Sequence, residues 1–151
     1  VVDHKYPLEW RNQGRASTKK IFENEKIKEV IMKTKLMKPK IWLIIIALLH
    51  LFMGVIGSYM TMGGSIENIA VFLYMGTLSI SLLYVALMTK GQTQARLAVV
   101  LCAPIAIWFI IGIVMKLKFL GYPVAEMPSG LLPLTLWSMP AITGAMNWNS
   151  D

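Results

Sequence analysis

A single histidine, His50, lies inside the apolar run ALLHLFMGVIGSY at residues 47–59. Its imidazole can ligate a metal, carry a proton or join helices through hydrogen bonds. An ionisable residue within a membrane span is a functional hypothesis by default. Four interpretations of His50 are open: a polar packing residue bonded to Ser, Thr or Tyr on another span, an axial ligand to haem or a chlorophyll-type pigment, a proton relay, or part of a quinone or lipid-headgroup site.

The rest of the sequence limits these interpretations. A haem with two histidine ligands needs a second intramembrane His, but the only other histidine, His4, is in the polar N-terminal region. A proton relay needs an acceptor, and no Asp or Glu occurs in the apolar runs. A quinone or lipid headgroup would have Tyr59 and Trp42 as neighbours. Helix packing is therefore the leading interpretation, cofactor binding at His50 is the alternative, and no cofactor is required by the sequence.

Other chemistry has little support in the sequence. It has no HExxH, GxSxG, phosphate-binding glycine loop or carboxylate pair, so we expect no catalytic residues and no enzyme activity. Eight of the eleven methionines are spread over all four apolar runs without clustering, which favours apolar filling over copper binding. The one cysteine, Cys102, excludes an internal disulfide and a cysteine-based metal cluster within one chain. We therefore expect no metal site.

Charge is strongly segregated along the chain. Only 15% of residues are charged, against about 25% in a typical soluble domain, and 56% are hydrophobic. Residues 1–40 hold eleven of the fifteen Lys and Arg residues. This pattern predicts a polar N-terminal arm, residues 1–40, followed by a membrane domain, residues 41–151. The first apolar run is expected to remain as an anchor rather than act as a signal peptide, and Met32 is an alternative start to Val1.

Four apolar windows predict the membrane domain, because a spanning helix needs roughly 20 apolar residues. They cover residues 41–62, 69–89, 97–115 and 130–148, and none contains Asp, Glu, Lys or Arg. Short connections make sequential helices antiparallel neighbours. We therefore expect an all-α polytopic membrane protein with an antiparallel bundle of four transmembrane helices.

Basic residues predict how the bundle is oriented. The arm and the loop at 90–96 carry most of them, so the positive-inside rule predicts that both termini are cytoplasmic. Trp42 and Trp148 are expected as interfacial anchors. The arm itself is expected to be partly helical, with no nucleic-acid motif. The expected location is a bacterial inner membrane or an energy-converting membrane, with the lipid bilayer and other membrane subunits, or further copies of the chain, as partners.

Small and weakly polar residues recur at helical spacing in every window, which is typical of faces where helix backbones approach closely. In the second window, Ser79 lies beside this face. The three prolines within the windows are expected to form packed kinks, with a hinge or an unwound site as the alternative. The expected packing residues are Gly54, Gly57, Ser58, Gly76, Thr77, Ser81, Gly112 and Gly144, and the expected kinks are at Pro104, Pro133 and Pro140.

The stretches LLHLFMGVIGSY and YMGTLSISLLYVALM, together with four short spans, resemble the DoxX-like group of small four-helix membrane proteins. The resemblance covers residues 41–148 and implies a helical bundle and an association with respiratory complexes, but it transfers no site residue. We expect a non-catalytic subunit that scaffolds or regulates a larger membrane complex, with a respiratory or other energy-converting complex as the candidate. A small oligomeric transporter or channel that uses Thr77, Ser81 and Tyr84, and a haem- or pigment-binding subunit centred on His50, are the alternatives.

Overall fold

The computed structural model describes residues 36–149. The chain divides into two units, Val1–Leu36 and Met37–Asp151, and the helices of the described part belong to the second. The predicted helical arm lies almost entirely outside the described residues. Within the second unit the helices are α2 (Pro39–Leu49), the π-helical segment η1 (His50–Gly57), α3 (Ser58–Thr61), α4 (Ile66–Met88), α5 (Gly91–Met115) and α6 (Leu131–Met146).

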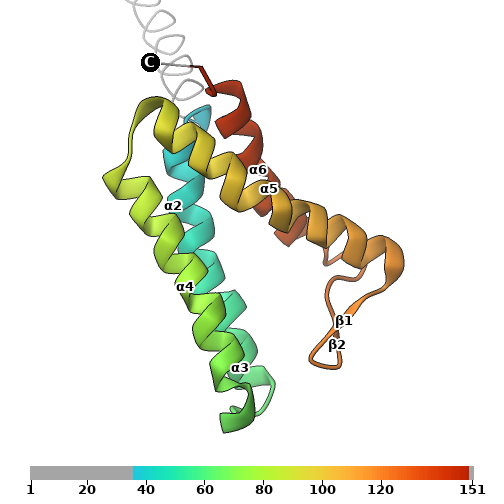
Figure 1. Cartoon of the computed structure of the whole chain (residues 1–151). Helices are drawn as coiled ribbons and strands as arrows, with labels where there is room; N and C mark the ends of the chain where they lie inside the picture. Colours follow the sequence, from blue (N-terminus) through green and yellow to red (C-terminus); the bar gives the residue numbers. More distant parts are fainter. Residues whose placement is uncertain (1–35, 150–151) are drawn as a thin grey trace, which may run out of the picture. The chain divides into compact units, whose positions relative to one another are not determined.

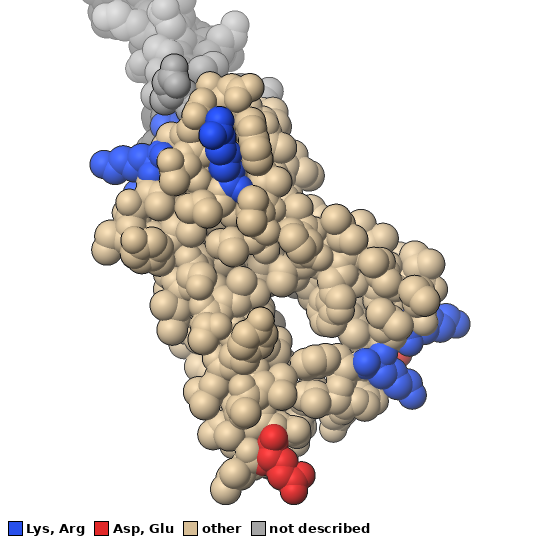
Figure 2. Space-filling view, in the orientation of Figure 1, with Lys and Arg blue, Asp and Glu red and all other residues tan. Residues whose placement is uncertain are grey.

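Three apolar helices are long enough to cross a membrane: Pro39–Thr61, which joins α2, η1 and α3, then α4 and α5. Each has 23 to 25 residues, as expected for a hydrocarbon core about 30 Å thick. On the face drawn in Figure 2, charged side chains occur only near the helix ends, and the surface between them is uncharged. These features confirm that the chain is an integral membrane protein with lipid-contacting helices.

The fourth predicted span differs from the expectation. Helix α6 is apolar but has only 16 residues, instead of the 19 in the predicted window 130–148. At 1.5 Å per residue it is about 24 Å long, which is less than the hydrocarbon thickness. Its N-terminal end is preceded by a tight segment in which Gly130 is buried against Ala125 and Glu126. The fold is all-α with four helical regions, but only three of them have full spanning length.

Residues 116–129 form more structure than the sequence suggested. Two short antiparallel strands, β1 (Lys118–Phe119) and β2 (Tyr122–Pro123), make a hairpin. Leu120 and Gly121 form its turn, and both have positive φ angles, 53° and 83°. Such a two-residue turn with positive φ at both positions suits the right-handed twist of paired strands. Glycine takes this conformation readily, so Gly121 is the residue that permits the turn.

The turn between α4 and α5 is closed by a buried side chain, Gln94. Its amide donates to the carbonyls of Val85, Ala86 and Thr89 at 3.1, 3.0 and 2.8 Å. The last carbonyls of a helix have no partner within that helix, and Gln94 supplies one from the next helix. A short polar loop therefore becomes a fixed connection between two long helices.

Helices α2 and α4 lie side by side, and so do α5 and α6 (Figure 1). Helix α2 also contacts α6, which joins the two pairs. Near the chain ends, the Asn147 amide donates to the Met37 carbonyl at 2.8 Å and so ties α6 to the start of α2. The core between the pairs is built from ten buried side chains: Leu43, Ile46, Ala47, Leu82, Val85, Ala86, Ala98, Cys102, Ala106 and Trp137.

Candidate functional site

His50 lies where three helices meet. It is the first residue of η1, and its Nδ1 atom is 2.8 Å from the hydroxyl oxygen of Ser79 on α4. Its ring also makes an edge-on contact with Trp137 of α6, with ring centroids 5.2 Å apart and planes at 79°. Ser79 is fully buried and Trp137 is 3% exposed. We call these three residues the His50 junction.

The chain around His50 is shaped to hold the imidazole. A Cβ atom at Gly54 would lie 3.0 Å from Cδ2 of His50, so the absence of a side chain at Gly54 leaves room for the ring. The helix changes from α to π geometry at His50. Such π-helical segments are rare and frequently occur at functional sites. The wider turn alters which residues after His50 face the other helices.

The contact with Ser79 engages one of the two ring nitrogens of His50. Among residues 36–149, the Ser79 hydroxyl has one hydrogen-bond partner, Nδ1 of His50. In one tautomer the hydroxyl donates to a bare Nδ1, and in the other Nδ1–H donates to the hydroxyl oxygen. In both cases Ser79 fixes the ring and leaves Nε2 as its second polar atom.

Neither Nε2 of His50 nor the indole nitrogen of Trp137 has a hydrogen-bond partner among residues 36–149. Trp137 is almost completely buried, and His50 is half-buried beside it. The His50 junction therefore holds two ring nitrogens whose hydrogen bonds are not supplied by the described part of the chain.

The predicted packing residues have different surroundings. Gly54 accommodates His50, while a Cβ at Gly57 would lie 3.3 Å from the carbonyl oxygen of Phe52 in the same helix. Gly112 is buried against Val124 of the loop rather than against another helix. Gly144 packs on α5, with its Cβ position 2.6 Å from the carbonyl oxygen of Ala95. Ser58 is half-buried, and its hydroxyl donates to the Met53 carbonyl of its own helix at 3.3 Å.

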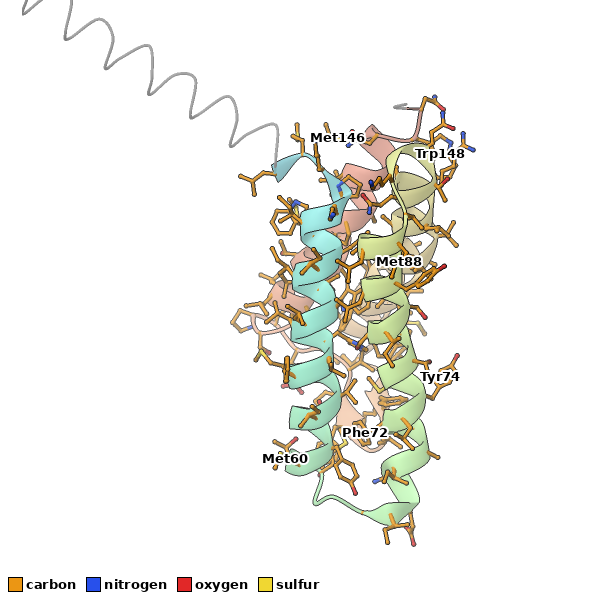
Figure 3. The ribbon with its side chains drawn as sticks, turned by 90° about the vertical axis from the view of Figure 1, so that its left-hand side faces the viewer. Met60, Phe72, Tyr74, Met88, Met146 and Trp148 are labelled. Atoms are coloured by element: carbon orange, nitrogen blue, oxygen red, sulfur yellow. The ribbon has the colours of Figure 1, made fainter. Side chains whose placement is uncertain are left out.

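The structure corrects the expected inward face of α4. Thr77 and Ser81 are exposed, and their hydroxyls donate to carbonyls of their own helix, at Tyr74 and Thr77. A Cβ at Gly76 would meet nothing within 4 Å. The face of α4 that packs within this chain carries other residues: Phe72, Ser79, Leu82, Val85 and Ala86. Figure 3 shows Phe72 between the helices and Tyr74 pointing away from them.

The predicted proline kinks and tryptophan anchors differ in their positions within the helices. Pro104 and Pro140 lie inside α5 and α6, where each removes one backbone donor from the helix. Pro133 is instead the third residue of α6, where backbone N–H groups have no intrahelical acceptor, so it is not a kink. Trp148 is at the end of the bundle, with the Arg96 guanidinium 5.5 Å from its ring centroid. Trp42 is half-buried near the start of α2.

Sequence reasoning missed two members of the site. Ser79 was noted beside the supposed packing face of its helix, although it is the partner of His50. Trp137 gave no signal, because a tryptophan in a short apolar run is equally compatible with a lipid-facing or a buried position. No group of three or more His, Cys, Asp or Glu residues that could hold a metal ion occurs in the described part of the chain.

A search against protein-family models, curated proteins and solved structures finds no match to this chain. The resemblance to DoxX-like proteins therefore stays an expectation.

Proposed function

We propose that this chain is a non-catalytic membrane subunit that scaffolds or regulates a larger membrane complex. One observation carries the proposal, the outward face of α4. This face consists of Tyr74, Thr77, Ser81 and Tyr84, and we call it the α4 outer face. Tyr74 is 78% exposed and Tyr84 is 62% exposed. Both side chains are therefore largely uncovered by the part of the chain that the structure describes.

The α4 outer face is unsuited to lipid because of the hydroxyl of Tyr74. That hydroxyl has no hydrogen-bond partner among residues 36–149. Tyr74 is the ninth of the 23 residues of α4, about 5 Å from the middle of the helix. Unsatisfied polar groups in hydrocarbon are costly, so a partner that accepts this hydrogen bond is favoured.

The middle of the same face is suited to a partner helix. Thr77 and Ser81 are four residues apart, and small residues at this spacing let helix backbones approach closely. Their hydroxyls are already bonded to their own helix, so they add no unsatisfied donor. Gly76 leaves open space beside them. A small centre flanked by two tyrosines supports docking of another membrane helix.

The subunit proposal predicts the native mass of the protein. Gently extracted from its own membrane, the wild-type chain should run with other polypeptides, well above its own mass. Thr77→Leu/Ser81→Leu should shift it to the mass of a single chain, because larger side chains hold a partner helix away. Native electrophoresis with identification of the co-migrating chains measures this.

A matched control uses the exposed surface of α6. Thr135→Leu/Ala145→Leu adds similar bulk at two exposed positions, and it should leave the complex intact. A wild-type peak that contains this chain alone would refute the subunit proposal. It would favour the oligomeric transporter or channel, which would use the same face to line or assemble a pore. In the haem or pigment alternative, Nε2 of His50 would be the axial ligand and Nδ1–H would donate to the Ser79 hydroxyl.

The same proposal includes an orientation with both termini in the cytoplasm of a bacterial or energy-converting membrane. Lys38, Lys40, Lys90 and Arg96 lie at the end of the bundle that holds the start of α2 and the α4–α5 turn. Lys116 and Lys118 are the only basic residues at the opposite end among the described residues. The excess of positive charge supports placing the first end inside.

Single cysteines test this orientation in a Cys102→Ala background, since Cys102 is buried. Thr93 and Tyr122 are exposed at opposite ends of α5 and its hairpin. Tyr122→Cys should react with a membrane-impermeant maleimide on intact cells, and Thr93→Cys should react only after permeabilisation. The reverse pattern would contradict the proposed orientation.

A further inference from the structure

We propose that the β1–β2 hairpin and the residues next to it bind the headgroups of anionic phospholipids at the membrane interface. We call residues 116–124 the interfacial hairpin. In this proposal Lys116 and Lys118 contact lipid phosphates, and the apolar side chains of the hairpin lie among the acyl chains near the headgroups. The proposal does not depend on the α4 outer face or on the orientation of the chain.

The interfacial hairpin lies beside the last part of α5 (Figure 1). The Leu117 N–H donates to the Gly112 carbonyl at 3.0 Å, and the Val124 N–H donates to the Leu117 carbonyl at 2.9 Å. A Cβ at Gly112 would lie 2.7 Å from Cγ1 of Val124, so the absence of a side chain at Gly112 permits this close approach. The hairpin is therefore held against a helix of membrane-spanning length.

An aromatic contact also brings the hairpin back along α5. The ring of Phe119 makes an edge-on contact with Trp108, with ring centroids 6.3 Å apart and planes at 89°. Trp108 precedes Met115, the last residue of α5, by seven residues, which correspond to about 10 Å along the helix axis. The hairpin thus folds back beside the apolar part of α5 instead of leading the chain away from the end of the helix.

The exposed surface of the hairpin is apolar and aromatic. Phe119 is 36% exposed, Leu120 is 38% exposed and Tyr122 is 52% exposed. In the last turn of α5, Val114 and Met115 are 75% and 66% exposed, so the hairpin continues the lipid-contacting surface of that helix. A ring with a polar group, such as that of Tyr122, is favoured where acyl chains meet headgroups. This continuity favours lipid as the neighbour of the hairpin.

The backbone of the hairpin restricts its depth in the membrane. A sheet of two strands leaves backbone N–H and C=O groups unpaired along the outer edge of each strand. Such groups are costly in hydrocarbon and need water or another polar partner. The apolar side chains and the polar backbone are both accommodated in the headgroup region, where water and phosphate groups are present.

Two lysines supply the charge that recognises a phosphate group. Lys116 and Lys118 are exposed, and neither forms an ion pair within residues 36–149. Glu126 is the one acidic residue between α5 and α6, so this segment has an excess of one positive charge. Lysine is a common phosphate ligand, and basic groups beside a membrane favour anionic lipids. The charge and the adjoining apolar surface together fit an anionic phospholipid.

A fluorescent label on the hairpin tests the proposal locally. Leu120→Cys is made in a Cys102→Ala background, labelled with bimane and placed in nanodiscs of phosphatidylcholine and phosphatidylglycerol in equal amounts. We expect a doxyl-labelled phosphatidylglycerol to quench the label more strongly than a phosphatidylcholine with the same doxyl-labelled chain. The two leaflets of a nanodisc have the same composition, so the orientation of the chain does not affect the result.

Charge variants measure the contribution of the lysines. One lysine beside an anionic surface changes lipid affinity by about fivefold, so Lys116→Gln/Lys118→Gln should abolish most of the preference for phosphatidylglycerol. Lys38→Gln/Lys40→Gln is the matched control, because it removes the same charge from exposed lysines at the opposite end of the bundle. The preference measured at the label should be unchanged in this control, and Glu126→Gln should increase it.

Three results would overturn the proposal. Equal quenching by the two lipids would show that the hairpin is an apolar anchor without headgroup selection. Quenching by aqueous iodide but by neither lipid would place the hairpin in water, where a protein partner could cover it. A preference that is unchanged in Lys116→Gln/Lys118→Gln would assign the anionic lipid to another part of the chain.

Discussion

Trp137→Ala is expected to lower the free energy of unfolding by about 3–5 kcal/mol, the loss typical of deleting a large buried aromatic side chain. Trp137 is 3% exposed and belongs to the core that joins the two helical pairs. Its removal leaves a cavity between α2 and α6, which closely packed helices cannot fill by relaxing. The edge-on contact with the His50 ring is lost with it.

Unfolding of the purified protein in mixed micelles, titrated with a denaturing detergent, measures this loss. Trp148→Ala is the control, because Trp148 is 39% exposed and its ring contact within residues 36–149 is with Arg96. A surface cation–π pair contributes about 0.5–1 kcal/mol, so the control should lose no more than that. Equal losses in the two variants would show that Trp137 is not part of the core.

Gly144→Ala is expected to destabilise the protein by about 1–3 kcal/mol, although alanine is the better helix former. A Cβ at Gly144 would lie 2.6 Å from the carbonyl oxygen of Ala95, 3.0 Å from Val99 and 3.2 Å from Ala98. The closest of these atoms is backbone and cannot move aside. The added methyl group must therefore push α6 away from α5, the pair of helices with the most extensive contact.

Gly76→Ala is the matched substitution for this prediction. Gly76 is also in the interior of a helix, but its Cβ position meets nothing within 4 Å. The same chemical change should therefore leave stability unchanged or raise it by up to about 1 kcal/mol, the difference in helix propensity. Thermal unfolding of both variants in one detergent compares them. A Gly144→Ala protein as stable as Gly76→Ala would show that α5 and α6 are not held at this distance.

The packed face of α5 could be predicted from the spacing of small residues in the sequence. Ala98, Cys102 and Ala106 recur every four residues in the sequence, and all three are buried in the structure. The other face of α5 carries Val100, Ile107 and Val114, which are large and exposed. One face of α5 carries small side chains and the other carries bulky ones, so the sequence was sufficient to predict which face packs against other helices.

Helix α4 has two comparable faces, and the prediction that the face with Thr77 and Ser81 packs inside the bundle was wrong. Thr77 and Ser81 lie on one face, while Ser79 and Ala86 lie on another. Both faces have small and weakly polar residues, so composition did not distinguish them. The structure places Ser79 inside, where its hydroxyl meets Nδ1 of His50. This hydrogen bond and the buried side chains Leu82, Val85 and Ala86 lie on the same face of α4.

The sequence by itself determined where the membrane helices are, because a bilayer offers no water to backbone polar groups and long apolar runs must therefore be helical. It also singled out His50 and predicted a hydroxyl on another span as its partner. Tertiary structure alone decided that this hydroxyl belongs to Ser79, that Trp137 lies beside it and that Gln94 closes the α4–α5 turn. These contacts join residues on different helices. They depend on how the packed helices are rotated relative to one another, which all of the helices determine together. The π-helical segment that begins at His50 changes this rotation for the residues that follow it.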